Sequence, residues 1–353
     1  MGFYSSLGVR RVLNACGIYT DLGGSSLSPA VWAAAAEANA TWASMDELIA
    51  ASGERIAGLI GAPAARVVPG ASAGIALAVG ACVAHGEGAV MEALPAVSSS
   101  VLVQRAHAEA YAYARCAALA GARVVVVDDL AAALATGAAA VLHPAHLDET
   151  GVPLEVVARL AREAGVPVVV DAAFQCFPVS AFGQWCSGSD VTVFSAKYFG
   201  GPNAGGFVAG RADVVADVAA LDFVGYESGP WRTFGRAFKL DRAGVVAVVR
   251  ALEEWLACDH AARLEGYSAL AARLQGLVGG VLCQFTLDER VLLEGPPNAV
   301  RVPGLAGAVD TLAAGDPSVR AVVDGDALVF NVEALSSPEV DELGAILSAR
   351  CPN

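Results

Sequence analysis

Lysine occurs only twice in this chain, at positions 197 and 239, among 22 lysine and arginine residues. An arginine guanidinium stays protonated, so lysine is the basic residue that can form an imine with a carbonyl compound. Lys197 follows the apolar run DVTVFS (190–195) and precedes the glycine-rich run GGPNAGG, with Phe194, Tyr198 and Phe199 nearby. Aromatic surroundings disfavour a charged ammonium group, which predicts a nucleophilic amine at Lys197. A solvated surface lysine is the structural alternative.

A carboxylate and a loop of small residues follow two other apolar runs. Asp171 ends GVPVVVD (165–171), and the loop PGASAG (69–74) connects a predicted strand to a predicted helix. Open α/β sheets bind ligands at the carboxyl ends of their strands, and small residues at a helix N-terminus let backbone N–H groups approach an anion. Asp171 as a turn or cap residue, and the loop as a plain turn, remain alternatives. The loop lacks the spacing of GxGxxG and the lysine of a P-loop, so neither a dinucleotide nor ATP is indicated.

An amine, a carboxylate and an anion-binding loop together fit one cofactor. Pyridoxal 5'-phosphate forms a Schiff base with a lysine, pairs its ring nitrogen with a carboxylate and needs a site for its phosphate. Asp171 and Lys197 are 26 residues apart (197 − 171), on two predicted strands that can lie side by side. We therefore predict pyridoxal phosphate as the cofactor.

The elements that must position these residues form an alternating series. Apolar strand-like runs alternate with helical patterns, which predicts an α/β fold with a mainly parallel sheet covered on both faces. The predicted strands are 65–68, 101–104, 122–127, 138–142, 166–171, 190–195 and 205–210. The predicted helices are 70–86, 108–121, about 154–164, 241–257 and 259–277. From about residue 278, short alternating stretches and a final helix from about 337 predict a small α+β C-terminal domain.

Composition excludes several classes of protein. The 353 residues are 56% hydrophobic, which excludes a disordered chain, and no apolar run reaches the roughly 18 residues of a membrane span. A net charge of −14 argues against nucleic acid as a partner, and the N-terminus does not resemble a secretory signal. The eight cysteines are scattered without zinc-ligand spacing, so no metal site is expected. We expect a cytoplasmic protein.

Stretches along nearly the whole chain resemble the fold-type I pyridoxal-phosphate enzymes, and more narrowly the selenocysteine synthase-like and D-glucosaminate-6-phosphate ammonia-lyase family. These stretches are LNACGIYTDLGGSSLSP (13–29), MDELIAASGERIAGLIGAPAARVVPGASAGIALAV (45–79), QRAH (104–107), GVPVVVDAA (165–173), FSAKYFGGPNAGG (194–206) and GRAFKLDRAGVVAVVRALEEWL (235–256). The resemblance implies the aspartate aminotransferase-like fold of the pyridoxal-phosphate-dependent transferases. We expect an N-terminal arm (1–30), a cofactor-binding large domain (31–261) and a small C-terminal domain (262–353).

The resemblance also implies roles for single residues. Lys197 would form the Schiff base, Asp171 would pair with the pyridine nitrogen, and His107 would lie against the cofactor ring. The other cofactor contacts would come from Gly70, Ala71, Ser72, Ala173, Ser195, Gly201 and Pro202. A histidine packed at a helix start and an ordinary strand-end hydroxyl are the alternatives for His107 and Ser195.

Substrate contacts are expected from residues outside the cofactor motifs. They are Tyr19, Thr20, Ser25, Gln175, Arg236 and Arg320. Arg320 lies where fold-type I enzymes often place the arginine that binds the substrate carboxylate, although a surface ion pair is an alternative for both arginines. His143 and His146 follow a predicted strand end and could also face the site, and their surroundings do not indicate a metal site.

The chain departs from the family pattern beside the predicted cofactor. Ala196 replaces the glycine usual before the lysine, and Asn203 replaces a glutamine. The bulky FQCFP (174–178) follows Asp171 closely, which indicates an altered substrate, and its Cys176 is either a reactive or a packed thiol. The RNA-binding N-terminal extension of true selenocysteine synthases is not present in this sequence, so tRNA is not expected as a substrate.

The expected reaction starts from an amino acid bound to the cofactor, with loss of its α-proton. The resemblance favours a lyase of the β-elimination or ammonia-lyase type, or a β-replacement. A racemase, an aldolase or an aminotransferase on the same scaffold is the alternative, as is a non-catalytic binding protein of this fold. Fold-type I active sites commonly use two chains, so a homodimer or a larger homo-oligomer is expected.

Overall fold

The computed structural model describes residues 2–287 and 290–350. Its contacts divide the chain into two compact units. The large unit is Ser25–Leu256, and the C-terminal unit combines residues 1–24 with residues 257–353. Residues 1–24, which the sequence assigned to an N-terminal arm, thus group with the C-terminal unit.

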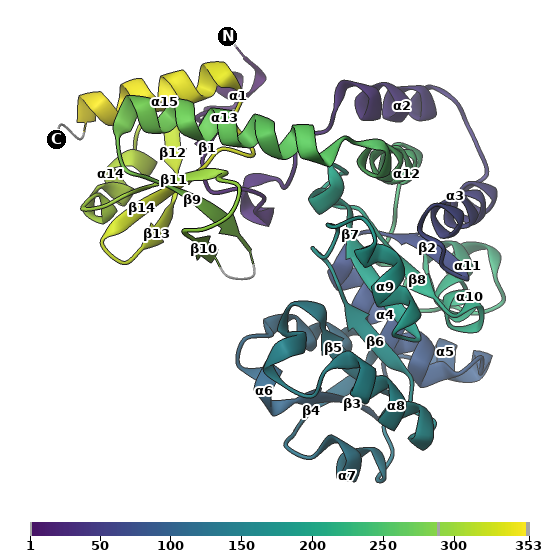
Figure 1. Cartoon of the computed structure of the whole chain (residues 1–353). Helices are drawn as coiled ribbons and strands as arrows, with labels where there is room; N and C mark the ends of the chain where they lie inside the picture. Colours follow the sequence, from purple (N-terminus) through teal and green to yellow (C-terminus); the bar gives the residue numbers. More distant parts are fainter. Residues whose placement is uncertain (1, 288–289, 351–353) are drawn as a thin grey trace. The chain divides into compact units, whose positions relative to one another are not determined.

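A seven-stranded sheet forms the centre of the large unit (Figure 1). Its order is β2-β8-β7-β6-β5-β3-β4, and β8 runs antiparallel to both of its neighbours while the other pairs are parallel. The strands are β2 (Ala64–Val68), β3 (Ser99–Gln104), β4 (Ala122–Val127), β5 (Ala140–Pro144), β6 (Val168–Asp171), β7 (Val191–Ser195) and β8 (Gly206–Gly210). The predicted mainly parallel α/β sheet is confirmed.

Each face of this sheet buries its own apolar cluster, as expected for a sheet covered by helices on both sides. On β6, Val169 belongs to one cluster, and Val168 and Val170 belong to the other. The Val169 face is covered by α4 (Ala71–Ala84), α5 (Gly88–Ala93), the 3-10 segment η2 (Ala112–Ala120) and α10 (Ala212–Leu221). The Val170 face is covered by α2 (Pro29–Ala40), α3 (Met45–Ile60), α7 (Leu130–Leu134), α8 (Leu154–Ala164), α9 (Ala181–Ser187), α11 (Phe223–Ser228) and α12 (Arg242–Ala257).

The helix predicted over 108–121 is wrong as a single element. The structure has a short α6 (Arg105–Ala108) followed by η2, with Tyr111 between them at φ −111° and ψ 80°. This conformation interrupts the helix, and the Tyr111 side chain is buried with 2% of its surface exposed. Tertiary burial of one aromatic ring outweighs the helix preference of the alanine-rich run.

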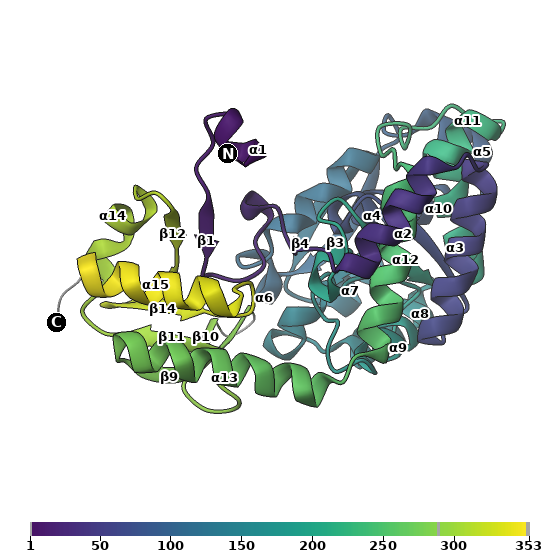
Figure 2. The same cartoon turned by 90° about the horizontal axis from the view of Figure 1, so that it is seen from above.

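The C-terminal unit is built on a five-stranded antiparallel sheet of order β10-β9-β11-β14-β13. The strands are β9 (Val281–Thr286), β10 (Arg290–Leu292), β11 (Ala299–Val302), β13 (Val322–Asp324) and β14 (Ala327–Asn331). Helices α13 (His260–Val278) and α15 (Ser337–Arg350) lie side by side against this sheet (Figures 1 and 2). The predicted small α+β domain is confirmed.

The first residues of the chain complete the C-terminal unit. Strand β1 (Val12–Asn14) pairs in parallel with β12 (Ser318–Arg320), so that Asn14 lies opposite Arg320. The shorter elements of the whole chain are α1 (Phe3–Ser6), η1 (Thr20–Leu22), η3 (Ala145–Thr150), η4 (Ala196–Phe199), η5 (Ala306–Ala308) and α14 (Val309–Ala313). Among the helices that the structure describes, none is both long and apolar enough to cross a membrane.

Candidate active site

Asp171 and Lys197 are brought together by neighbouring strands, as the sequence predicted. Strands β6 and β7 are parallel, with Asp171 paired to Val193. Beyond the ladder, the Ser195 backbone N–H donates to the Ala173 carbonyl at 3.0 Å. The carboxyl ends of the two strands therefore lie side by side. Asp171 ends β6, and Ser195 ends β7 two residues before Lys197.

Asp171 is a buried carboxyl group held by two neutral donors. The Tyr111 hydroxyl donates to Oδ2 at 2.7 Å, and the Ala173 backbone N–H donates to Oδ1 at 3.1 Å. Burial raises the pKa of Asp171, while the two hydrogen bonds and nearby His146 oppose that rise. Because neither donor carries a charge, a cationic group such as a protonated ring nitrogen would complete the pairing of a buried carboxylate.

Lys197 lies in η4, directly after β7, and only 7% of its surface is exposed. Its Nζ is 4.9 Å from the centre of the Tyr198 ring. A row of aromatic contacts continues from there: Tyr198 to Phe174 at 5.7 Å, Phe174 to His146 at 5.2 Å, and His146 to Tyr111 at 6.1 Å between ring centres. We call these four rings the aromatic rim. It connects the surroundings of the lysine with those of Asp171.

The predicted phosphate loop lies at the same edge of the sheet. Gly70, at φ +91°, directly precedes α4, whose first two residues are Ala71 and exposed Ser72. Gly206 pairs with both Val68, which ends β2, and Ser195, which ends β7, so the loop and Ser195 are separated by one strand. A Cβ on Gly206 would lie 2.3 Å from the Phe194 carbonyl oxygen and 3.3 Å from Gly70 Cα. The open N–H groups of the first turn of α4 offer an anion a site there.

The loop after the lysine is closed by short contacts. The Gly201 N–H donates to the Ala196 carbonyl at 2.8 Å, and a Cβ on Gly201 would lie 2.7 Å from the Ala196 Cβ. The Ser25 hydroxyl donates to the Gly201 carbonyl at 2.6 Å, and Pro202 follows, half-buried. Ser25, predicted as a substrate contact, is therefore placed beside the lysine loop.

His107 lies in a different environment from Asp171. It is fully buried, and its ring meets the His143 ring edge-on with 5.2 Å between ring centres. His143 shares a 2.8 Å hydrogen bond between Nε2 and Asp148 Oδ1. Burial lowers the pKa of His107 to about 4 and also lowers the pKa of His143. His107 is thus buried at a helix start, its place against the cofactor ring stays a prediction, and His146 belongs to the aromatic rim.

Three further candidates make contacts within the large unit. Cys176 is buried, burial raises the pKa of its thiol, and its carbonyl accepts a hydrogen bond from Trp255 Nε1 at 2.7 Å. It is therefore a packed thiol. Arg236 forms an ion pair with Glu227 at 2.5 Å. Gln175 is half-buried beside Asp171 in sequence, and its N–H donates to the Ala172 carbonyl at 3.0 Å.

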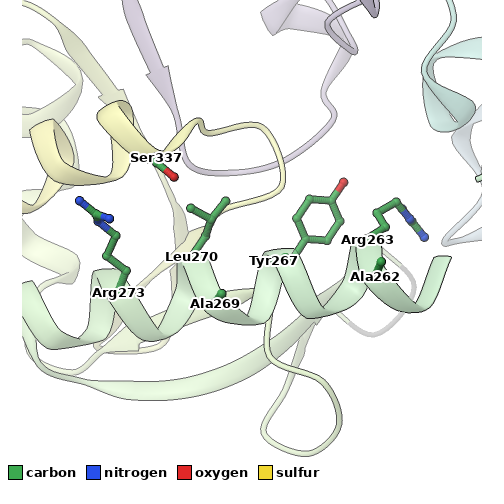
Figure 3. A pocket seen from close by; sticks show the side chains of 8 residues that line it. Ala262, Arg263, Tyr267, Ala269, Leu270, Arg273 and Ser337 are labelled. Atoms are coloured by element: carbon green, nitrogen blue, oxygen red, sulfur yellow. The ribbon is translucent and has the colours of Figure 1, made fainter. Parts of the chain in front are cut away.

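The remaining substrate candidates belong to the C-terminal unit. Tyr19, Thr20 and Arg320 are all exposed there, and Arg320 ends β12 beside Asn14. The same unit holds a cavity of about 640 Å³ lined by α13 and the start of α15 (Figure 3). Arg263, Tyr267 and Arg273 project from α13 into it, and Arg273 forms two hydrogen bonds to Asp341. None of the predicted site residues lines this cavity.

Sequence analysis did not single out Tyr111 or Cys116. Both belong to the segment after α6, where Ser72 of the predicted phosphate loop opposes the rise that burial gives the pKa of the Cys116 thiol. Tyr111 and Tyr113 alternate with alanines in AEAYAYA, and this pattern does not indicate which ring points inward. In the structure the helix is interrupted after α6, and this interruption places the Tyr111 ring in the interior, whereas the Tyr113 ring is 60% exposed.

Comparison with known proteins identifies relatives along most of the chain, although no family model matches it. The chain is 31% identical to a 5'-C-glycyluridine monooxygenase-decarboxylase from Streptomyces sp, over 90% of this chain and 83% of that one. It is also 31% identical to the D-glucosaminate-6-phosphate ammonia lyase of Salmonella typhimurium, over 71% of this chain and 69% of the relative. An L-seryl-tRNA(Sec) selenium transferase of Moorella thermoacetica is 27% identical, over 96% of this chain and 81% of the relative.

Solved structures show the same fold. A D-glucosaminate-6-phosphate ammonia-lyase superposes with a TM-score of 0.82 at 24% identity, covering 98% of this chain and 97% of the other. A variant of serine palmitoyltransferase from S. paucimobilis with a bound pyridoxal phosphate–myriocin aldimine superposes with a TM-score of 0.57 at 15% identity, covering 96% of this chain and 87% of the other. On these identities and this fold, the chain belongs to the D-glucosaminate-6-phosphate ammonia-lyase and selenocysteine synthase-like family of fold-type I pyridoxal-phosphate enzymes.

Proposed function

We propose that this protein is a pyridoxal-phosphate-dependent lyase that removes the α-proton of an amino acid and then expels a β-substituent, with release of ammonia. One observation carries the proposal: buried Asp171 and buried Lys197 end neighbouring parallel strands, beside a glycine loop that opens onto a helix N-terminus. The relatedness to an ammonia lyase over most of the chain supports the elimination.

The residues present fit the cofactor. Asp171 is a buried carboxylate whose two neutral donors leave room for a pyridinium N–H, and Lys197 supplies the amine. The N–H groups at Gly70, Ala71 and Ser72, with the Ser195 hydroxyl one strand away, would bind the phosphate. When bound, pyridoxal phosphate withdraws electrons from the α-carbon of the amino acid.

Lys197 would act as the general base once the substrate amine has taken its place. Its Nζ is held near the Tyr198 ring in a site that is almost closed to solvent, which favours the neutral amine. Asp171 would keep a proton on the ring nitrogen. The half-buried rings of Phe174, Tyr198 and His146 would exclude water from the α-carbon and limit the shape of the substrate side chain.

A second candidate reaction is the oxygen-dependent decarboxylation of an amino acid. The monooxygenase-decarboxylase relative shares 31% identity over 90% of this chain, a longer match than that of the ammonia lyase. Both reactions need the same lysine and aspartate and differ in which bond to the α-carbon is broken. Racemisation, aldol cleavage and transamination use this scaffold as well.

The test begins with absorbance spectra of the purified protein, with and without added pyridoxal phosphate. Wild type and Lys197→Ala are compared with Lys239→Ala, which removes the other lysine of the chain and is the matched control. We expect borohydride to fix the cofactor on the peptide that contains residue 197 in wild type and in Lys239→Ala. Absence of cofactor binding by wild type would overturn the proposal.

Amino acids are then screened under air and under nitrogen. Release of ammonia and a keto acid in both atmospheres supports the lyase. Oxygen uptake with CO₂ release, lost under nitrogen, would instead establish the second candidate. Exchange of the α-proton without release of product would point to a racemase.

We also propose that the enzyme is a cytoplasmic homodimer or a larger homo-oligomer. The N-terminal residues Phe3 and Tyr4 are 79% and 66% exposed, and Trp32 of α2 and Trp42 beyond it are 61% and 86% exposed. Exposed aromatic residues of this size are typical of surfaces that are covered in an assembly. Light scattering gives the mass directly, and a monomer at micromolar concentration would contradict this proposal.

A further inference from the structure

Tyr111 has a direct structural link to the proposed chemistry. Its hydroxyl is 2.7 Å from Asp171 Oδ2, and both side chains are buried, with 2% and 6% of their surfaces exposed. The ring is held by the turn after α6, where its backbone N–H donates to the His107 carbonyl at 3.0 Å. The hydrogen bond is therefore formed by groups that the fold positions closely.

The two oxygens of Asp171 have separate partners. Oδ1 accepts from the Ala173 N–H and Oδ2 accepts from Tyr111, which fixes the plane of the carboxyl group. Each carboxylate oxygen can accept more than one hydrogen bond, so a further donor can still approach. A phenol that donates to a carboxylate stabilises its charged form more than its neutral form.

We propose that Tyr111 is a positioning residue that keeps the Asp171 carboxyl group ionised and correctly oriented to hold the proton of the cofactor ring nitrogen. This inference rests on the proposed function. It adds a residue that acts through Asp171, whose carboxyl group accepts the hydrogen bond of the Tyr111 hydroxyl.

The charged and titratable groups that face this pair are consistent with the role. His146 lies across from Tyr111 and favours the charged form of Asp171, and Cys116 of η2 interacts with both Asp171 and Tyr111. Lys197 follows the adjoining strand end. Burial and Asp171 itself raise the pKa of Tyr111 well above 10, so Tyr111 remains a neutral donor over the working pH range.

The test measures Asp171 in the cofactor-free protein. Aspartate is labelled with ¹³C at Cγ, the Asp171 resonance is assigned as the one missing in Asp171→Asn, and its titration is followed by NMR. We expect Tyr111→Phe to raise the titration midpoint by about one to two pH units, because it removes a hydrogen bond to a charged group. Tyr113→Phe, which changes the neighbouring exposed ring, is the matched control and should leave the midpoint in place.

A second measurement uses the loaded enzyme. Tyr111→Phe should lower kcat about tenfold at neutral pH, with KM little changed, because the loss falls on the step that needs the protonated ring. An unchanged Asp171 midpoint in Tyr111→Phe would overturn the inference. Failure of wild type to bind pyridoxal phosphate would overturn the proposed function instead, and the two failures are seen in separate experiments.

If Tyr111→Phe does not fold, 3-fluorotyrosine at position 111 keeps the ring and the hydroxyl and makes the hydroxyl a stronger donor. The Asp171 midpoint should then move down rather than up. A midpoint equal to that of wild type would also count against the inference.

Discussion

The two faces of the central sheet carry two polar clusters that are close in sequence and differ in chemistry. On β5 and β6, Pro144 is paired with Asp171 and His143 with Val170. Side chains alternate along a strand, so Asp171 lies on the Val169 face, where it meets Tyr111, whereas His143 lies on the Val170 face, where it meets His107. A shift of one residue therefore separates the buried carboxyl group of Asp171 from a pair of buried imidazoles whose pKa values are lowered.

The comparison shows how burial is used in each cluster. Asp171 is buried with donors that favour its charge, whereas His107 and His143 are buried in surroundings that favour their neutral forms. We therefore expect changes near Asp171 to affect chemistry and changes near His143 to affect stability.

The largest expected difference compares two carboxylates. Asp171→Asn removes the proposed partner of the cofactor ring nitrogen and should lower kcat by at least about a hundredfold, the scale of a lost acid–base contribution. Asp148→Asn weakens the hydrogen bond to His143 and should keep activity within about threefold while lowering stability by about 1–2 kcal/mol.

Steady-state kinetics and thermal unfolding of both variants provide the measurement. Equal losses of activity in Asp171→Asn and Asp148→Asn would contradict the expectation that residues near Asp171 affect chemistry and residues near His143 affect stability.

The histidine cluster predicts a loss of stability in acid. The pKa of His107 is about 4 in the folded protein and about 6.5 in an unfolded chain, so the unfolded chain binds the extra proton first as pH falls. The contribution of the uncharged His107 to the free energy of unfolding is fully present above pH 6.5. It is lost progressively as the pH falls toward 4, and the loss is on the order of 2 kcal/mol.

Urea unfolding between pH 7 and pH 4.5 measures this loss. His107→Gln should flatten the pH dependence, and His146→Gln, which changes a half-buried histidine of the aromatic rim, should leave it nearly unchanged. Identical slopes in wild type and His107→Gln would rule out His107 as the source.

For cofactor affinity we expect the reverse order: His146 is the residue whose change matters, and His107 is the control. His146 contacts Tyr111 and Phe174 and lies near Asp171, so His146→Gln should weaken pyridoxal phosphate binding about fivefold to tenfold, the scale of one lost contact in a desolvated site. His107→Gln should change the affinity by less than about twofold. The opposite order would support the cofactor position that the family resemblance implies for His107.

The sequence predicted the sheet, and it predicted that Asp171 and Lys197 follow two strands that can lie side by side, for a physical reason. Val-rich runs give each strand a strong local signal, and a lysine that occurs only twice in the chain stands out at a strand end. The face of the sheet on which a side chain lies depends on strand register. Register is set by pairing with distant strands, and the apolar pattern of a single strand does not reveal that pairing. That is why His143, His146 and His107 could not be sorted from the sequence.

The close approach of Gly206 and the inward turn of Tyr111 were also beyond the sequence. Gly206 is one of several glycines in its run, and only the structure shows the Phe194 carbonyl oxygen 2.3 Å from where its Cβ would lie. Tyr111 sits in an alanine-rich run with strong helix propensity, and its burial against Asp171 is a tertiary effect.

The smallest expected effect separates the two contacts that the segment after α6 makes with the site. The Tyr111 hydroxyl donates to Asp171, whereas the Cys116 thiol of η2 lies close enough to Ser72 of the predicted phosphate loop for Ser72 to oppose the burial-driven rise of the thiol pKa. Cys116→Ser keeps a donor and acceptor at that position, so its affinity for pyridoxal phosphate should stay within about twofold of wild type. Cys116→Val removes the polar group near Ser72 and should weaken binding no more than about threefold, because Ser72 is exposed and can bind water instead. A loss of affinity in Cys116→Ser as large as that in Cys116→Val would mean that the volume of the side chain, rather than its polar group, supports the predicted phosphate loop.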